Sequence, residues 1–178
     1  MRKNKKEMYT KKFEIRWSDV DANRHLRNSA YIDFMSHTRM DFMMKNGLGH
    51  ESLAKHDLGP VAFFEHVYYF REVFPGAPVY VSLQLKGMAE DGRFFNFLHN
   101  FYDEHGKNFA RCEMMGGWID MKTRKLTGLP KEFLDRFNAF EKAPEFKVLT
   151  AEDTREYGQR PEDLDFSPDA SPSGEKNP

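Results

Sequence analysis

Residues 29–46 constrain the fold most, because they predict one long helix that needs cover from water. Asn28 or Ser29 can cap its start, and Gly47 follows it as a natural stop. Such a helix would be roughly 27 Å long. Its apolar side chains cover much of its circumference, so we expect it to be buried. Its positions at helical spacing are Tyr31, Phe34, Met35, Thr38 and Phe42, and Ile32 and Met43 flank them.

The segments around this helix alternate between apolar and polar residues, which is typical of half-buried strands. One strand is expected before the helix, at 9–17, with Phe13, Ile15 and Trp17 on one face. Turn residues such as Asp91-Gly92 separate four further strands. These four are expected at 61–73, 79–88, 93–102 and 108–120.

Three shorter features complete the expected elements. Gly116-Gly117 predicts a bulge in the last of these strands. Residues 50–57 are compatible with a short helix or a loop, and residues 131–140 predict a short helix after Pro130. The order as a whole predicts an α+β fold in which one antiparallel sheet wraps around one long helix. Because one sheet covers only part of a helix, the remaining helix surface and the sheet edge favour dimerisation.

The chain divides into three regions by composition. We expect a basic extension at 1–8, a folded domain at 9–143 and an acidic tail at 144–178. The tail holds five of the nine prolines and few apolar residues, so we expect it to be partly disordered. Removing residues 150–178 should then leave activity intact.

Charge and cysteine content exclude several classes of protein. The formal net charge is -1, and the excess charges of the two ends have opposite signs, which leaves the body nearly neutral. A nucleic-acid-binding face needs a basic stripe on the folded domain, so none is expected. The single Cys112 excludes an intrachain disulfide and a cysteine-based zinc site. We find no secretory signal and no membrane span, and we expect a soluble cytoplasmic protein.

The loop before the long helix concentrates the polar chemistry: Asp19, Asp21, Asn23, His25 and Asn28. A helix N-terminus supplies free N–H groups and partial positive charge, which suit a carboxyl or thioester oxygen that becomes negative during reaction. A nearby carboxylate can act as a general base on water or attack the carbonyl itself. These are the parts of an acyl-transfer site.

The pattern alone also allows plainer explanations for this loop. Asp and Asn before a helix are most often caps, and a lone histidine is more often structural than catalytic. The spacing of the loop residues predicts no metal site. Residue types and periodicity therefore leave a hydrolase, a binding module and a structural dimer open.

The segment Trp17-Ser-Asp-Val-Asp-Ala-Asn-Arg-His-Leu-Arg-Asn-Ser-Ala-Tyr31 resembles the opening of hotdog-fold acyl-CoA thioesterases. The 4-hydroxybenzoyl-CoA thioesterase-like group begins with a strand, an Asp-x-Asp loop, a tyrosine ten residues after the second Asp and the long helix. The Asp-x-Asn-x-His sequence is also similar to the motif of plant acyl-ACP thioesterases. The resemblance covers about residues 9–140 and implies a hotdog fold, although the specific motif lies near the start.

The resemblance implies a role for each loop residue. Asp21 would be the catalytic carboxylate, acting as general base or nucleophile, and Asp19 a structural acceptor. Asn23 and His25 would orient substrate or water, and the backbone N–H at Asn28 would polarise the thioester carbonyl. Other members have a histidine at the Asn28 position or a helix glutamate, and neither is present here.

Further residues are candidates for contact with substrate. Glu65 could face the site or an exposed surface, and Arg93 could contact CoA phosphate or be a plain surface side chain. Tyr31 would serve in packing first. The full set of substrate-binding candidates is Tyr31, Phe34, Met35, Phe63, Phe64, Glu65 and Arg93.

The implied activity is hydrolysis of an acyl-CoA or acyl-ACP thioester in fatty acid metabolism. The CoA thioester would be the substrate, with no cofactor or metal, and the site would lie at the shared edge of a homodimer or of a dimer of dimers. Two alternatives stay open: a non-catalytic hotdog dimer that binds acyl-CoA or an acyl carrier, and a hotdog hydratase or dehydratase.

Overall fold

The computed structural model describes residues 8–164, so most of the predicted basic extension and the end of the acidic tail lie outside the described residues. Two short 3₁₀ turns, Trp17–Asp19 and Asp153–Arg155, accompany the main elements. The helices are α1 (Asn28–Lys45), α2 (His50–Ala54) and α3 (Lys131–Asn138). The strands are β1 (Tyr9–Phe13), β2 (Leu58–Tyr69), β3 (Val79–Met88), β4 (Phe94–Tyr102), β5 (Asn108–Asp120) and β6 (Lys142–Val148).

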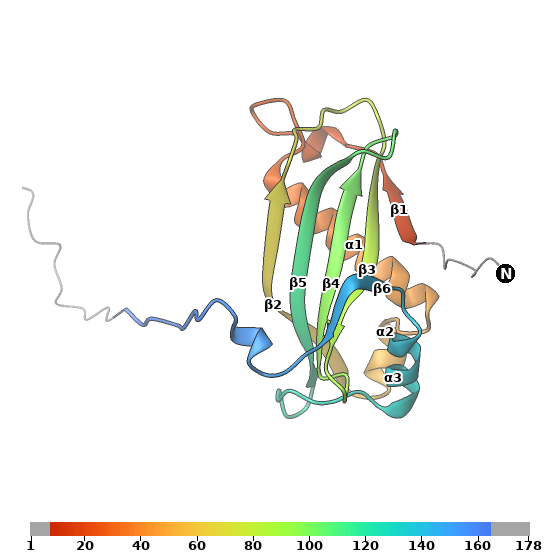
Figure 1. Cartoon of the computed structure of the whole chain (residues 1–178), viewed down its shortest axis with the longest axis vertical. Coiled ribbons are helices and arrows are strands. Elements are labelled where there is room, and N and C mark those ends of the chain that lie inside the picture. The colour runs from red at the N-terminus through yellow and green to blue at the C-terminus, as the bar shows by residue number, and fades with distance from the viewer. Residues whose placement is uncertain (1–7, 165–178) are drawn as a thin grey trace, which may run out of the picture.

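Five strands form one antiparallel sheet in the order β1-β3-β4-β5-β2, and β6 adds to β3 in parallel. Helix α1 lies across one face of this sheet (Figure 1). The predicted α+β arrangement of one sheet wrapped on one long helix is therefore confirmed. Strand β2, with 12 residues, forms one edge of the sheet, and the much shorter β1 forms the other.

Two apolar clusters fill the space between α1 and the sheet. The cluster under the first half of α1 includes Tyr31, Phe34 and Met35. The cluster under the second half includes Met43 and Trp118. Burial of this apolar surface is the main favourable contribution to folding, and it fixes α1 on the sheet.

A polar layer separates these two clusters. Thr38 and Arg39 follow Met35 on α1, and His99 lies between Phe97 and Phe101 on the same face of β4. Thr38 and His99 have no exposed surface. Thr38 satisfies its hydroxyl by donating to the Phe34 carbonyl at 2.7 Å. The core beneath α1 is therefore interrupted at mid-length by side chains that need hydrogen-bond partners.

The first strand is shorter than its alternation predicts. It ends at Phe13, and Trp17, expected on its buried face, is 93% exposed. The cause is local, because the Asp19 carboxylate accepts hydrogen bonds from the Arg16 backbone N–H at 2.9 Å and from the Arg16 guanidinium. These bonds turn the chain out of the strand. The expected shared face of Phe13 and Trp17 was wrong.

The start of α1 and the bounds of β2 also differ slightly from expectation. Helix α1 begins at Asn28, and the Asn28 side-chain oxygen accepts the Ser29 N–H at 2.8 Å without forming the expected N-cap. Strand β2 starts three residues earlier than predicted and ends four earlier. Gly47 follows α1 with a positive φ of 72°, as the predicted stop requires.

The predicted irregularity near Gly116-Gly117 lies in the partner strand. The register shifts in β2 between Ala62 and Phe64, opposite Gly116. A Cβ on Gly116 would lie 2.7 Å from the Val61 carbonyl oxygen and 2.9 Å from the Phe95 ring. The glycine therefore permits a close approach of β2 and β5 rather than a bulge of its own.

The ordered chain continues past Ala143, where the domain was expected to end. Strand β6 pairs with β3, and Leu149 is buried. The Tyr157 ring then packs 4.1 Å from the His66 ring and 5.3 Å from the Phe64 ring, measured between centroids. The first part of the expected tail thus belongs to the fold, and deletion from residue 150 would remove the Tyr157 contacts.

Candidate functional site

The polar loop before α1 closes on itself and is held against the end of the sheet. Val20 and Leu26 form an isolated antiparallel bridge, and the Leu26 N–H donates to the Val73 carbonyl at 2.8 Å. Arg24 makes the return with a left-handed φ of 67°. These backbone bonds fix the loop relative to the first turn of α1, so its side chains are positioned rather than free.

Asp21 is the centre of this loop. Its Oδ1 accepts the Asn23 backbone N–H at 2.8 Å, and its Oδ2 lies 3.2 Å from His25 Nδ1. The Asp21 and His25 side chains are 31% and 27% exposed. The structure therefore brings Asp21, His25 and the backbone of Asn23 together, whereas the Asn23 side chain is exposed. The carboxylate is oriented and still reachable from solvent.

A surface hollow of about 400 Å³ opens beside this carboxylate. Asp21, His25, Asn28 and Tyr31 line one wall, and residues 69–72 line the other. The Tyr31 ring stands edge-on to the Tyr69 ring with centroids 4.9 Å apart. Burial, reinforced by Tyr69 and Asp21, raises the pKa of Tyr31 to about 12. The Tyr31 hydroxyl therefore stays neutral at physiological pH.

Asp19 has a different environment from Asp21. Its side chain is fully buried, and Arg16 donates to both carboxylate oxygens, with each guanidinium bond at 3.0 Å. These hydrogen bonds lower the pKa of Asp19. Both carboxylate oxygens of Asp19 are thus already bonded to Arg16, which suits the structural acceptor that the resemblance implies.

The substrate-binding candidates do not gather at the Asp21 hollow, except for Tyr31. Phe34 and Met35 are buried in the core under α1. Phe64 packs on Tyr157 at the outer face of the sheet. The Phe63 ring on β2 lies 6.2 Å from the Phe94 ring, measured between centroids. Arg93 is exposed beside Asp91. Phe63 and Arg93 lie toward the end of the sheet opposite Tyr69.

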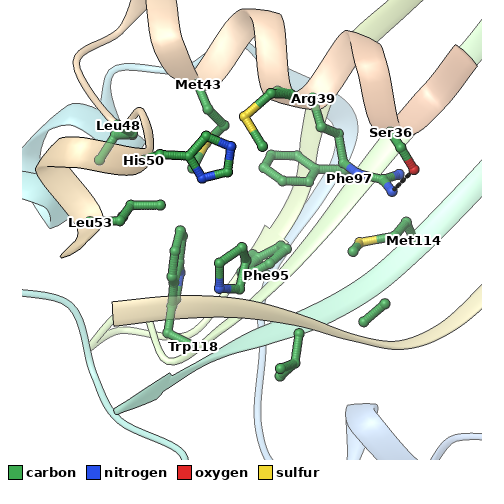
Figure 2. Close-up of a pocket in the computed structure, with 14 residues that line it drawn as sticks. Ser36, Arg39, Met43, Leu48, His50, Leu53, Phe95, Phe97, Met114 and Trp118 are labelled. Atoms are coloured by element: carbon green, nitrogen blue, oxygen red, sulfur yellow. Dashed lines mark hydrogen bonds between the residues drawn. The ribbon is translucent and has the colours of Figure 1, made fainter. Parts of the chain in front are cut away.

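A second hollow lies between the second half of α1 and the sheet (Figure 2). It has a volume of about 270 Å³ and a mostly apolar lining. Met43 and Arg39 reach into it from α1, and Phe95, Phe97 and Trp118 approach from the sheet (Figure 2). We call this space the helix cavity. The sequence did not predict it, because its walls come from five separate elements.

An ion pair joins α1 to the edge strand beside the helix cavity. Arg39 Nη2 lies 3.0 Å from Glu65 Oε1 and also donates to Ser36 Oγ at 3.0 Å. The two side chains are only 15% and 17% exposed. Burial lowers the pKa of Arg39, and the neighbouring Glu65 opposes that change. Glu65 therefore faces α1 and not the exposed outer surface.

His99 contributes the other buried titratable group of the polar layer. Its Nδ1 lies 2.8 Å from the Ser82 carbonyl oxygen. Burial lowers the pKa of His99 to about 3, and the positive charge of Arg39 adds to the effect. The ring is therefore neutral throughout the physiological range.

This neutral histidine predicts a loss of stability in mild acid. In the unfolded chain a histidine titrates near 6.5, so below that pH the unfolded state binds a proton that the folded state excludes. The contribution of His99 to the free energy of unfolding should therefore fall by up to about 1.4 kcal/mol per pH unit between pH 6.5 and 3. Urea unfolding at several pH values would measure this slope. The slope should diminish in His99→Asn, and an equal slope in the variant would contradict the assignment.

Two further features concern the described residues as a whole. Within residues 8–164, no three metal-ligating side chains converge to form a potential metal site. None of the helices in that range combines the length and the apolar character that a bilayer crossing needs.

Comparison with known proteins agrees with this architecture. The model of the thioesterase-like superfamily matches residues 15–137. No curated protein sequence matches the chain significantly. Among solved structures, a hypothetical protein from Staphylococcus aureus in complex with CoA aligns with a TM-score of 0.70 at 18% identity, covering 89% of this chain and 96% of that one.

Two structures of named thioesterases are also similar. A 1,4-dihydroxy-2-naphthoyl-CoA thioesterase from Synechocystis aligns with a TM-score of 0.66 at 13% identity, covering 75% of this chain and 97% of that one. A DHNA-CoA thioesterase from Staphylococcus aureus aligns with a TM-score of 0.65 at 18% identity, covering 73% of this chain and 86% of that one. At these identities the likeness establishes the fold, which is the hotdog fold that the resemblance implies.

Proposed function

The chain belongs to the thioesterase-like superfamily, and on this premise we propose that it hydrolyses an acyl-CoA or acyl-carrier-protein thioester. One observation carries the proposal: an oriented, solvent-reachable Asp21 carboxylate lines a hollow together with the first turn of a buried helix. The CoA in the Staphylococcus aureus neighbour and the CoA thioester named for the Synechocystis enzyme favour a CoA substrate.

In the proposed reaction, Asp21 acts as a general base on water. Both carboxylate oxygens already have partners, Asn23 N–H and His25, which hold the anion in place. Water attacks the thioester carbonyl carbon and gives its proton to Asp21. The backbone N–H of Asn28 has no intrahelical acceptor, so it can stabilise the carbonyl oxygen as that oxygen becomes negative. The intermediate then expels the CoA thiolate, which takes up the proton and leaves a free carboxylic acid.

The experiment that tests this proposal is a panel of acyl-CoA and acyl-carrier-protein thioesters assayed for free thiol. We expect thiol release above the uncatalysed rate with at least one member. Thermal stabilisation by acyl-CoA without thiol release would instead indicate a binding dimer. Hydration of crotonyl-CoA without thiol release would indicate a hydratase.

We further propose that the working unit is a dimer joined along β2. This edge strand is 12 residues long, and its Tyr68 and Tyr69 side chains are 48% and 52% exposed. Phe70, which follows the strand, is 56% exposed. A long exposed edge strand is a template for pairing with another strand. A two-fold axis near the middle of β2 would pair it antiparallel with its copy.

Such a dimer would complete the site. The helix cavity lies beside residues 60–62 of β2, whereas the Asp21 hollow lies beside residues 69–72. Antiparallel pairing about the strand centre would set the cavity of one protomer next to the Asp21 hollow of its partner. The cavity would then receive the acyl group while the partner supplies the carboxylate.

Heterodimers test this arrangement. Ala62 lines the helix cavity, so the larger side chain in Ala62→Trp would fill it. We expect Asp21→Asn and Ala62→Trp each to be inactive as a homodimer. In a heterodimer of the two, one site combines an intact Asp21 with an open cavity, so about half of the wild-type activity should return. Tagged co-expression and a thiol assay would measure it, with light scattering to confirm the dimer. An inactive heterodimer would place each complete site within one protomer.

A further inference from the structure

Residues 149–157, which we call the C-terminal strap, follow β6 across the outer face of the sheet, the face away from α1. Leu149 packs in a cluster with Phe94 of β4 and Met115 of β5. Phe94 precedes and Met115 follows a residue of the core under α1, and neighbours along a strand point to opposite faces. The strap therefore starts from an anchor on the outer face.

The strap ends on the edge strand β2. The Tyr157 ring packs 4.1 Å from the His66 ring and 5.3 Å from the Phe64 ring, measured between centroids. Tyr68 is the next residue on the same face of β2. We call these four side chains the edge cluster. Tyr157 and Tyr68 are 46% and 48% exposed, so the cluster still offers aromatic surface to a partner.

The edge cluster lies where a dimer joined along β2 would have its seam. Phe64 and His66 are close to the middle of β2, and the two-fold axis of the proposed dimer passes near that point. Beyond Tyr157, residues 158–164 continue past the β2 edge of the sheet (Figure 1). A strand that pairs with β2 therefore comes beside both the edge cluster and the end of the strap.

We propose that the edge cluster is part of the interface between two copies of this chain, and that the strap serves to hold Tyr157 there. This inference rests on the dimer of the proposed function. About its two-fold axis, the two clusters would lie about 10 Å apart along the strands and one strand spacing apart across them. Aromatic side chains reach over that separation, so the two clusters would form one apolar surface over the seam.

A second copy suits this surface better than a charged partner. The edge cluster contains no carboxylate, lysine or arginine, so it offers no permanent charge to bind. A two-fold contact needs a surface that complements itself, and aromatic rings pack favourably on one another in tilted and edge-on arrangements. Tyrosine and phenylalanine are also enriched in protein interfaces. The composition of the cluster therefore favours its own copy.

Tyr157→Ser tests the interface, with Tyr157→Phe and Val148→Ser as controls. We expect the dissociation constant of the dimer, measured by analytical ultracentrifugation, to rise about tenfold or more in Tyr157→Ser, because each dimer loses two rings. Tyr157→Phe keeps the ring and should stay near the wild-type value. Val148 is 57% exposed but lies on the β3 side of the sheet, so Val148→Ser should change nothing. Circular dichroism would confirm that the variants are folded.

A cross-link tests the geometry without removing Tyr157. The single native cysteine, Cys112, is buried, so Glu156→Cys, at an exposed position, supplies the reactive thiol next to Tyr157. At a concentration where light scattering shows a dimer, we expect a short bismaleimide to join the two protomers. In Lys12→Cys, on the opposite edge strand β1, the two thiols would lie about 40 Å apart along the paired sheets, so no cross-link should form.

The interface also has a consequence for activity. Because the composite site needs two copies, thiol release per protomer by Tyr157→Ser should fall on dilution and return at high protein concentration. The expectation from composition that residues 150–178 are dispensable for activity would then fail in dilute solution.

The dissociation constants and the cross-link do not depend on thioesterase activity. A wild-type dimer that gives both expected results but releases no thiol would refute the proposed function and leave the interface standing. Equal dissociation constants for Tyr157→Ser and the wild type would overturn the interface, and so would the absence of a cross-link in Glu156→Cys. A wild-type protein that stays monomeric would overturn it as well, and Tyr157 would then cover its own strand alone.

Discussion

Replacing Asp21 by asparagine is expected to lower kcat/KM for thioester hydrolysis by about 10³-fold, the range of a lost general base. The variant keeps the shape of the side chain, and its amide oxygen can still accept the Asn23 N–H that holds Asp21 at 2.8 Å. Folding should therefore be preserved, while the group that takes the proton from water is lost. Steady-state thiol release and a thermal melt on the same preparation would measure both quantities.

Asp33→Asn is the matched control, because it makes the same chemical change on α1. The Asp33 side chain is 59% exposed and lies 3.6 Å from Arg27, so its loss should alter neither activity nor stability appreciably. Equal activity in Asp21→Asn and Asp33→Asn would remove Asp21 from the mechanism. A large loss in both would indicate that the net charge of this end, rather than one carboxylate, governs the rate.

Replacing Arg39 by methionine is expected to destabilise the fold by about 3–5 kcal/mol. Methionine fills much of the volume of the arginine stem, but Glu65 is then left 17% exposed without its counter-ion. An uncompensated buried charge is the origin of the loss. Urea unfolding at fixed protein concentration would measure it, since a dimer's apparent stability depends on concentration.

The double variant Arg39→Met with Glu65→Leu tests that explanation. Removing both charges should restore most of the stability, because an ion pair replaced by apolar side chains is often neutral or better. If the double variant were as unstable as the single one, packing by the arginine stem would be responsible instead of the charge. The interaction energy of the two substitutions therefore identifies the cause.

The central helix and the Asp21 loop could be predicted because their signals are local. The helix shows in its own spacing of apolar residues, and Asp21, Asn23 and His25 lie within five residues of one another. Alternation also predicted the strands. It failed at Trp17, where the hydrogen bonds between Arg16 and Asp19 override the strand pattern.

The helix cavity and its polar layer could not be predicted in this way. Arg39 and Glu65 are 26 residues apart, and their pairing depends on how α1 crosses the edge strand. Alternation assigns His99 to a face of β4 but does not say that the face is buried beneath α1 at this point. Strand β6 was missed for another reason. It contains Pro144 and polar residues, so its composition predicted a part of the tail, although proline is tolerated in edge strands.

The central claim, that the Asp21 hollow hydrolyses a thioester, is tested most directly by a single turnover. The wild-type protein, in molar excess over each acyl-CoA, is mixed with it, and free CoA is followed by thiol titration. With a substrate that fits, we predict first-order release of one CoA per acyl-CoA, and no such release with Asp21→Asn. Acyl-CoA that stays bound and intact on the wild-type protein across the whole panel would contradict the claim.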